Sequence, residues 1–431
     1  MTTTAASARD AWPLLLARLD HARAATDSLF GLLIDEAFYD RSIGERHRIG
    51  FYRGHLDAFD WNLLNGRLFD HASFNPEFDH LFAFGIDPVD GELPSDEVSD
   101  WPQRSEVERY GWSIRDVIDH ELRQVERNGV DVLPSGQSSA LLLNVAIEHR
   151  LMHAETLTYL LHQLPLERKV AGQPSHPVER TRAANMCVAV TGGPARLGMP
   201  DSANGSFGWC NEYAGLDVEV PAFQIDKYMV SNGEFLAFVE AGGYRDPAHW
   251  SAAGWAWREA GGIDHPVFWR RAADGWRQRT MFDEIALPPD WPVYVSHAEA
   301  SAFARWAGKA LPSEAQWQRA AGTRRPRHGN FDFAYFDPVS VDSDLHERSE
   351  SGAVGMWGNG WEWTDSVFAP LPGFSAYECY PGYSANFFDG QHYVLKGGSA
   401  RTASCMIRPS FRNWFQPHYQ YVYAGFRCVR A

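Results

Sequence analysis

Two histidines four residues apart, His149 and His153, are the strongest candidates for chemistry in this 431-residue sequence. They lie between Gln137 and Gln163, in a stretch without Pro or Gly whose leucines and valines recur at helical spacing. Residues four apart share one face of a helix, so both imidazoles are able to bind one metal ion. A third ligand has to come from another element, and His55, in a second apolar helical segment, is the best candidate.

The spacing alone is weak evidence, because histidine pairs at this spacing also occur by chance on many helices. The pattern also differs from the zinc protease motif HExxH, since Glu148 precedes His149 instead of following it. No general base therefore stands where a zinc protease has one. The case for a metal site depends on the rest of the chain.

Four helices are predicted before Pro165, over residues 8–34, 44–64, 113–128 and 137–163. Together they predict a four-helix bundle, whose core is where facing helices commonly build metal sites. The passage 65–100 is rich in Pro, Gly and Asp and is predicted as a long loop that contributes to a site. Residues 134–136, Pro-Ser-Gly, break the chain before the last helix.

Beyond Pro165 the composition changes. Residues 169–198 are polar and rich in Gly, Pro and Arg, which predicts a linker. The remaining residues are dense in Gly, Trp and Tyr, with short strands and two clear helices, 231–240 and 297–308. The sequence therefore predicts an α+β protein with a helical domain at 1–168, a linker at 169–198 and an irregular domain at 199–431.

Composition and charge exclude several classes of partner. The net charge is −16 and there is no run of Lys and Arg, which argues against nucleic acid or an anionic membrane surface. No apolar run of 18 residues and no signal peptide are found, so we expect a cytoplasmic protein. The five cysteines have no CxxC spacing and are expected to be reduced thiols. Seventeen tryptophans suit an aromatic core or a pocket for an organic cation.

Five ordered motifs run through the second half of the chain. They are VSNGEFLAFV at 230–239, WAGKALPSEAQW at 306–317, WGNGWEWT at 357–364, KGGS at 396–399 and AGFRCV at 424–429. This set resembles the formylglycine-generating enzyme domain, a variant of the C-type lectin fold. The helical half resembles the DinB-like bundle, and the fused pair resembles the ergothioneine-type sulfoxide synthases, which are nonheme iron enzymes.

The resemblance implies an iron(II) site. In the family three histidines hold the ion, and they correspond to His55, His149 and His153. Three neutral imidazoles leave open positions on iron for dioxygen and for a soft sulfur or selenium donor. The family uses this iron and O2 to join a chalcogen to C2 of the imidazole of hercynine, the trimethylammonium betaine of histidine, and the chalcogen ends oxidised.

The resemblance also implies residues that bind hercynine, namely Asn413, Trp414 and Phe415. A quaternary ammonium has no N–H to donate, so aromatic faces suit it, while Asn413 is able to hydrogen-bond the carboxylate. Ordinary core packing is the alternative for Trp414 and Phe415. Met152, just before the last histidine, is a further substrate-binding candidate, although the family usually has Gln there.

Two other departures bear on the chemistry. A tyrosine that follows WEWT in the ergothioneine enzymes corresponds to Phe368, which has no proton to give. The arginine-bearing segment that grips the carboxylates of gamma-glutamylcysteine is not recognisable at 101–109, where Arg104 and Arg109 stand in different surroundings. No catalytic acid or base is assigned. Three tyrosines that follow Phe368 are candidates to replace the missing tyrosine, and each is also compatible with a surface or core role. They are Tyr377, Tyr380 and Tyr383.

Residues 45–61 and 81–90 are most similar to selenoneine synthases, whose donor is the selenosugar 1-seleno-glucose. A neutral sugar needs hydroxyl and carboxylate partners in place of paired arginines. The leading hypothesis is therefore an iron- and O2-dependent oxidoreductase that forms a carbon–selenium bond on hercynine.

Two other functions stay open. The first is an ergothioneine-type sulfoxide synthase that uses gamma-glutamylcysteine or cysteine. The second is a non-catalytic binding module, because lectin-like domains also serve as scaffolds. A formylglycine-generating activity is disfavoured, because Cys405 and Cys428 show no pattern of a reactive cysteine pair.

Overall fold

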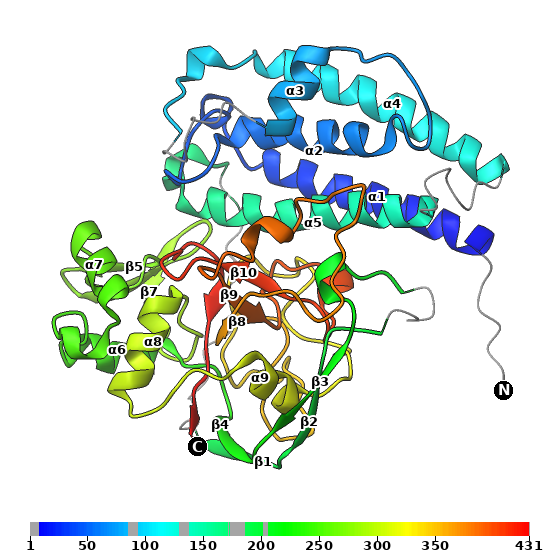
Figure 1. Ribbon diagram of the computed structural model, residues 1–431. Coiled ribbons are helices and arrows are strands. Elements are labelled where there is room, and N and C mark those ends of the chain that lie inside the picture. Colours follow the sequence, from blue (N-terminus) through cyan, green and yellow to red (C-terminus); the bar gives the residue numbers. More distant parts are fainter. Residues whose placement is uncertain are drawn as a thin grey trace. The chain divides into compact units, whose positions relative to one another are not determined.

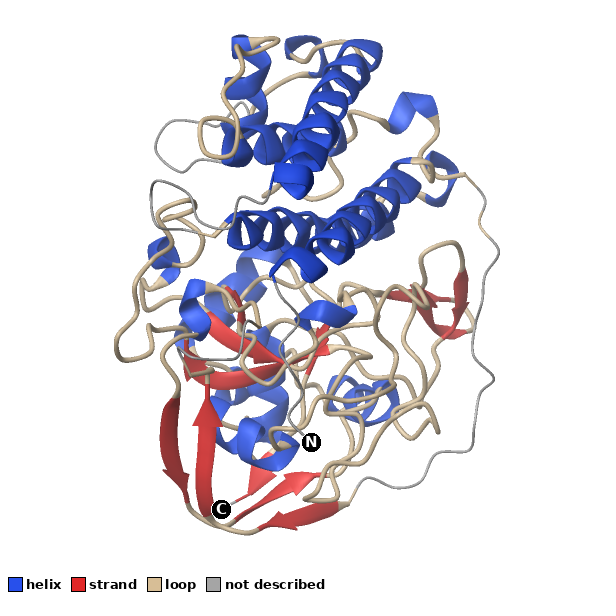
Figure 2. Ribbon diagram, turned by 90° about the vertical axis from the view of Figure 1, so that its right-hand side faces the viewer, coloured by secondary structure: helices blue, strands red, loops and turns tan. Residues whose placement is uncertain are grey.

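The computed structural model describes residues 8–84, 94–128, 138–170, 172, 186–200 and 206–430. Contacts divide the chain into two units, unit 1 at Met1–Gln173 and unit 2 at Pro174–Ala431. Unit 1 is helical and unit 2 mixes short helices with short strands (Figure 2), so the α+β class is confirmed. The predicted break at 134–136, residues 171 and 173–185 of the predicted linker, and residues 85–93 of the predicted loop lie outside the described residues.

Unit 1 contains the predicted bundle of long helices and one additional short helix. The helices are α1 (Ala8–Phe30), α2 (Ile49–Leu64), α3 (Pro76–Phe84), α4 (Arg104–Asn128) and α5 (Ser139–Gln163). Helix α1 packs along α5, and α2 contacts α4, α3 and α5 (Figure 1). Helix α2 therefore lies where its side chains meet three other helices.

Helix α5 begins where the Ser138 hydroxyl accepts a hydrogen bond from the Leu141 N–H at 3.1 Å. Its leucines are buried on several sides, which explains why the helix is apolar around most of its circumference. No helix among the described residues meets the length and hydropathy needed to cross a bilayer.

Predicted bounds of three helices in unit 1 are wrong, and one helix was not predicted. Helix α1 ends at Phe30 instead of residue 34. Helix α2 begins at Ile49 instead of residue 44, because Arg48 has extended backbone and pairs with Asp96. Helix α4 begins at Arg104 instead of residue 113, and Gly111 lies inside it. Helix α3 occupies part of the predicted loop 65–100, and its first turn is capped by Asn75, whose side chain accepts from the Phe78 N–H at 3.1 Å.

Unit 2 contains four short helices and four small sheets within its described residues. The helices are α6 (Asn232–Glu240), α7 (Ala252–Gly261), α8 (His297–Trp306) and α9 (Glu314–Ala321). The first and third are the predicted helices, whereas α7 and α9 were not predicted. Each is only eight to ten residues long and begins at a serine cap, so the periodic signal is short.

The strands of unit 2 are short. They are β1 (Cys187–Val190), β2 (Gly193–Leu197), β3 (Leu216–Val220), β4 (Phe223–Asp226), β5 (Trp269–Ala272), β6 (Gly275–Arg279), β7 (Glu284–Ala286), β8 (Trp361–Val367), β9 (Tyr393–Lys396), β10 (Asn413–Phe415), β11 (Ala424–Gly425) and β12 (Val429–Arg430). The sheet orders are β1-β4-β12, β10-β9-β8-β11, β2-β3 and β5-β6-β7. Strands β1 and β2 lie in the stretch predicted as a linker. They were not predicted because Gly192, Gly193 and Pro194 are residues typical of loops.

Two of the sequence motifs meet in one sheet. Strand β11, from AGFRCV, pairs in parallel with β8, from WGNGWEWT. The buried Arg427 guanidinium contacts the Glu362 carboxylate at 2.6 Å, and Trp317 donates its indole N–H to the same carboxylate at 2.9 Å. The motifs therefore encode a buried charge pair that fixes the centre of unit 2.

Candidate metal centre

The structure brings His55, His149 and His153 together inside unit 1. His55 comes from α2 and the other two from α5, and the ligand atoms of the three all lie within 4.8 Å of one another. Two imidazole nitrogens that each lie about 2.1 Å from one ion are at most about 4.2 Å apart. Small side-chain adjustments therefore suffice for all three to bind one ion.

The orientation of His55 is set by a neighbouring helix. Its Nδ1 lies 2.7 Å from the carbonyl oxygen of Phe82 on α3, and a carbonyl accepts only, so Nδ1 carries the proton. The lone pair of Nε2 is then left for a metal. Gly54 permits this contact, because a Cβ at residue 54 would lie 2.4 Å from the Phe82 ring.

The electrostatics of the site keep the three imidazoles neutral. Burial lowers the pKa of His55 to about 4, and the hydrogen bond to Phe82 only partly offsets that effect. Burial and then the charge of the neighbouring histidines lower the pKa of His149 well below its usual value. Burial and His55 do the same to the pKa of His153. Neutral imidazole is the form that binds metals, so the site competes weakly for protons at neutral pH.

The residues present fit a metal ion. The Nδ1 atom of His153 is buried and has no hydrogen-bond partner among the described residues. Burying such a nitrogen without a partner is unfavourable, and a bound cation would remove that penalty for the cluster. Imidazole suits iron, zinc, copper and nickel, so the ligand set alone does not choose among them.

Aromatic rings pack against the three histidines. Phe59 stacks on His149 with ring centroids 3.4 Å apart, and Phe51 stacks on His55 at 4.9 Å. Rings of this kind exclude water and hold the imidazoles in place. His149 is buried, whereas His55 and His153 keep partial exposure.

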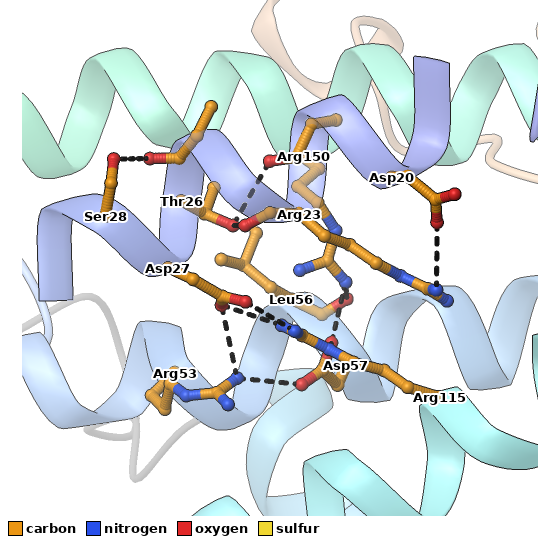
Figure 3. Close-up of polar contacts among 12 residues, drawn as sticks. Asp20, Arg23, Thr26, Asp27, Ser28, Arg53, Leu56, Asp57, Arg115 and Arg150 are labelled. Atoms are coloured by element: carbon orange, nitrogen blue, oxygen red, sulfur yellow. Dashed lines mark hydrogen bonds and ion pairs between the residues drawn. The ribbon is translucent and has the colours of Figure 1, made fainter. Parts of the chain in front are cut away.

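A buried arginine joins the two helices that carry the histidines. Arg150, next to His149 on α5, is fully buried, and its Nη2 donates to the Leu56 carbonyl at 2.8 Å, to Asp57 at 2.8 Å and to Asp60 at 2.6 Å. Figure 3 shows the Arg150 side chain reaching Leu56 and Asp57 of α2. One guanidinium therefore holds α5 against the turn of α2 that follows His55.

Asp57 is shared with two further arginines. Arg53 contacts it at 2.9 Å and Arg115 of α4 contacts it at 2.9 Å, while Arg115 also binds Asp27 at 2.6 Å (Figure 3). Burial opposes ionisation of Asp57, but the three guanidinium groups outweigh it and hold the pKa of Asp57 well below its usual value. The network links α1, α2, α4 and α5.

A cavity of about 560 Å³ opens beside the site, between α2 and α3. His55, Phe59 and Asn62 line it from α2, and Asp79 and His80 line it from α3. Residues of the passage 65–100 thus line this cavity, on a helix that was not predicted, and their contribution to a site stays a prediction.

The residues predicted to bind hercynine lie on β10 of unit 2. Asn413, Trp414 and Phe415 are all half-buried. The Asn413 Oδ1 accepts from the Trp414 N–H at 2.9 Å, which leaves its amide NH2 to donate. The Trp414 ring stacks on buried Phe368 at 4.3 Å, and Tyr383 meets it edge-on at 5.3 Å. Part of the Trp414 surface is thus committed to packing.

Phe368 and the three tyrosines after it lie in unit 2, where Phe368 stacks on Trp414 and the tyrosines have the following contacts. Phe368 is 1% exposed. Tyr377 donates its hydroxyl to the Gly208 carbonyl at 2.5 Å, and Tyr383 stacks on Trp209 at 3.9 Å. Burial raises the pKa of both Tyr377 and Tyr380. Their phenols are therefore protonated at neutral pH.

The remaining predicted residues belong to unit 1. Met152 is half-buried on α5, between His149 and His153 in sequence. Arg104 pairs with Asp35 and with Glu108, each at 2.8 Å, whereas Arg109 is exposed.

Sequence reasoning missed the supporting residues Phe82, Phe59 and Arg150. The sequence did contain a signal for Arg150. Arg150 is a charged residue within one apolar helix, and Asp57 and Asp60 are charged residues within another. Charged side chains in such positions are buried only when they are paired. No signal in the sequence identified the backbone carbonyl of Phe82.

Comparison with known proteins agrees with this architecture. The family model of the sulfatase-modifying factor enzyme 1-like domain matches residues 173–431. The hercynine oxygenase of Mycolicibacterium thermoresistibile is 36% identical over 71% of this chain and 72% of its own. The hercynine oxygenase of Mycobacterium tuberculosis is 36% identical over 71% and 75%. Ergothioneine biosynthesis protein 1 of Neurospora crassa is 26% identical over 93% of this chain and 55% of its own. The chain therefore belongs to the hercynine oxygenase family and carries a sulfatase-modifying factor enzyme 1-like domain.

Proposed function

We propose that the chain is a nonheme iron(II) oxidoreductase that joins the selenium of a selenosugar, 1-seleno-glucose, to C2 of the hercynine imidazole. The observation that carries the proposal is the convergence of His55, His149 and His153 in a chain related to hercynine oxygenases. The reaction balances as one selenol, one hercynine and one O2 giving one selenoxide and one water. Formation of the C–Se bond releases the selenol proton, the C2 proton and two electrons. Oxidation of the selenium to the selenoxide releases two further electrons, and O2 accepts all four.

The residues of unit 1 hold and shield the metal. Iron(II) supplies O2 activation and a binding position for a soft chalcogen. The histidines remain neutral at working pH, Phe82 fixes the His55 tautomer, and Phe51 and Phe59 stack on the rings of His55 and His149. Met152 adds an apolar thioether beside the last histidine, where it is able to contact the substrate.

The residues of β10 receive hercynine in this proposal. The Asn413 amide NH2 donates to the carboxylate. The uncommitted parts of the Trp414 and Phe415 rings contact the trimethylammonium group, which binds aromatic faces through the ring quadrupole.

The state of Arg104 favours a neutral donor. A dicarboxylate thiol such as gamma-glutamylcysteine needs cationic partners, but Arg104 is already paired with Asp35 and Glu108. Its guanidinium also lies over the Phe38 ring, 5.0 Å from the centroid. Freeing it for a substrate would break these contacts.

Side-by-side turnover tests the proposal. Iron-loaded protein is given hercynine, O2 and one donor at a time, with 1-seleno-glucose, 1-thioglucose, gamma-glutamylcysteine and cysteine in parallel. We expect the sugar selenol to be coupled fastest, measured as the hercynine adduct by mass spectrometry. Coupling of only the dipeptide or cysteine would identify a sulfoxide synthase instead, and no coupling with any donor would point to a binding module.

A further inference from the structure

The cavity between α2 and α3 has the size and position of a ligand site. Its volume of about 560 Å³ lies within the range of roughly 300–1,000 Å³ typical of small-molecule pockets. His55 forms part of its wall. A ligand in this cavity therefore lies against one of the three metal-binding histidines.

Phe59 connects the cavity to a second histidine. It lines the cavity, and its ring stacks on that of His149 with an interplanar angle of 11°. Phe59 thus adds apolar carbon to the wall beside His55. Such a wall suits the C–H face of a sugar ring, whose burial against carbon is favourable.

The cavity lining also includes residues with hydrogen-bonding groups. The Asp79 carboxylate accepts from the Tyr110 hydroxyl at 2.6 Å and from the Ser73 hydroxyl at 2.5 Å. A carboxylate has about four acceptor positions, so two remain for ligand hydroxyls. The Asn62 Nδ2 donates to the Asp79 carbonyl over 3.4 Å, a long and weak hydrogen bond, and the exposed His80 also lines the cavity.

The charge of the lining selects against acidic ligands. The described residues around the cavity include one carboxylate, Asp79, and neither lysine nor arginine. A donor with two carboxylates would meet Asp79 without a cation to compensate, which is unfavourable. A neutral polyol both donates and accepts hydrogen bonds and carries no such penalty.

From these observations we infer that the α2–α3 cavity is the donor subsite and that it binds the ring of a neutral hexose, with Asn62, Asp79 and His80 contacting its hydroxyls. The inference rests on the proposed function, because the chalcogen at C1 of that hexose is the atom directed at the metal. It adds the residues that recognise the donor.

Binding measurements test the subsite separately from turnover. Calorimetric titration of the full-length, iron(II)-loaded protein with 1-thioglucose, without oxygen, gives the affinity directly. We expect Asn62→Ala and His80→Ala each to weaken binding about three- to tenfold, the size of one lost hydrogen bond to a neutral group. Iron content and hercynine affinity should stay at the wild-type level.

His120→Ala and Gln124→Ala are the matched controls. These side chains contact each other at 3.3 Å on α4 and do not line the cavity. Both variants should bind 1-thioglucose like the wild type. Equal losses in the control and the cavity variants would overturn the subsite.

The reverse substitution gives a gain of function. Asn62→Arg places a cation beside Asp79, so we expect tighter binding of gamma-glutamylcysteine and weaker binding of 1-thioglucose. If Asn62→Ala and His80→Ala bind 1-thioglucose like the wild type while the wild type still couples the selenosugar, the subsite is wrong and the proposed function stands. If binding depends on Asn62 but no sugar is ever coupled to hercynine, the subsite stands and the proposed function fails.

Discussion

The Nη2 atom of Arg150 donates to the carbonyl oxygen of Leu56 at 2.8 Å. Arg150 follows His149 and Leu56 follows His55, so this bond joins the two helices one residue away from a metal-binding candidate on each side. The same nitrogen also contacts Asp57 and Asp60, both buried. We therefore treat Arg150 as a positioning residue that sets the separation of His55 from His149.

Replacing Arg150 by Met should destabilise unit 1 and loosen the site. The change leaves the buried Asp60 carboxylate without its guanidinium partner, whereas Asp57 keeps Arg53 and Arg115. Loss of one partner of a buried ion pair costs about 3–5 kcal/mol of unfolding free energy. We also expect metal affinity to fall about 10–100-fold, as when other supporting residues of metal sites are removed. Denaturant unfolding and competition with a chelator measure the two effects.

Arg168→Met is the matched control, because Arg168 pairs with Asp40 at a partly exposed position. It should leave both the unfolding free energy and the metal affinity close to those of the wild type, because exposed ion pairs contribute little. A normal chelator competition curve for Arg150→Met would contradict the positioning role even if stability fell.

Replacing His149 by Ala should abolish stable metal binding. One of three ligands is lost, and the remaining two come from different helices, so affinity should fall by more than about a hundredfold. Metal content after iron loading and desalting measures it, with the exposed His71→Ala as the control. Wild-type iron content in the His149 variant would remove the proposed site.

The long helices of unit 1 were predictable, but their ends depended on packing. Helix α5 was predicted from residue 137 and begins at Ser139. The two starts agree closely because the capping residue, Ser138, is next to the helix in the sequence. The first turns of α4 were missed because Gly111 is typical of a helix boundary. A Cβ at residue 111 would lie 2.4 Å from the Asp57 carboxylate, so this glycine reflects close packing of α4 on α2. That reason lies in tertiary structure.

The histidines of the candidate site were predictable, whereas their supports were not. A spacing of four residues is visible in the sequence, so His149 and His153 could be paired on one face of a helix. The Phe82 carbonyl acts on His55 across 27 residues, and Arg150 acts on Leu56 across 94. Neither contact follows from a local pattern.

Replacing Gly54 by Ala should disturb the orientation of His55. The added methyl group would lie 2.4 Å from the Phe82 ring, so α3 must shift and the hydrogen bond from His55 to the Phe82 carbonyl lengthens. We expect a loss of about 1–3 kcal/mol in unfolding free energy, as for other overpacked sites, together with weaker metal binding.

Gly44→Ala controls for the loss of glycine flexibility. A Cβ at residue 44 meets nothing within 4 Å, so this variant should bind metal normally. Normal metal affinity in Gly54→Ala would show that the contact with Phe82 does not orient His55.

Acid should destabilise unit 2 through His297. Burial lowers its pKa to about 3 from the usual 6.5, and its ring stacks on Tyr393 at 3.9 Å. Because the unfolded state binds the proton more tightly, the stability present above about pH 6.5 is lost as pH falls toward 3, by about 2 kcal/mol at pH 5. The wild type should therefore lose unfolding free energy between pH 7 and pH 5. We expect this loss to be about 2 kcal/mol smaller in His297→Gln. The control is His328→Gln, at an exposed position, which should lose as much unfolding free energy between pH 7 and pH 5 as the wild type. If His297→Gln also loses as much as the wild type, His297 is not the group that titrates.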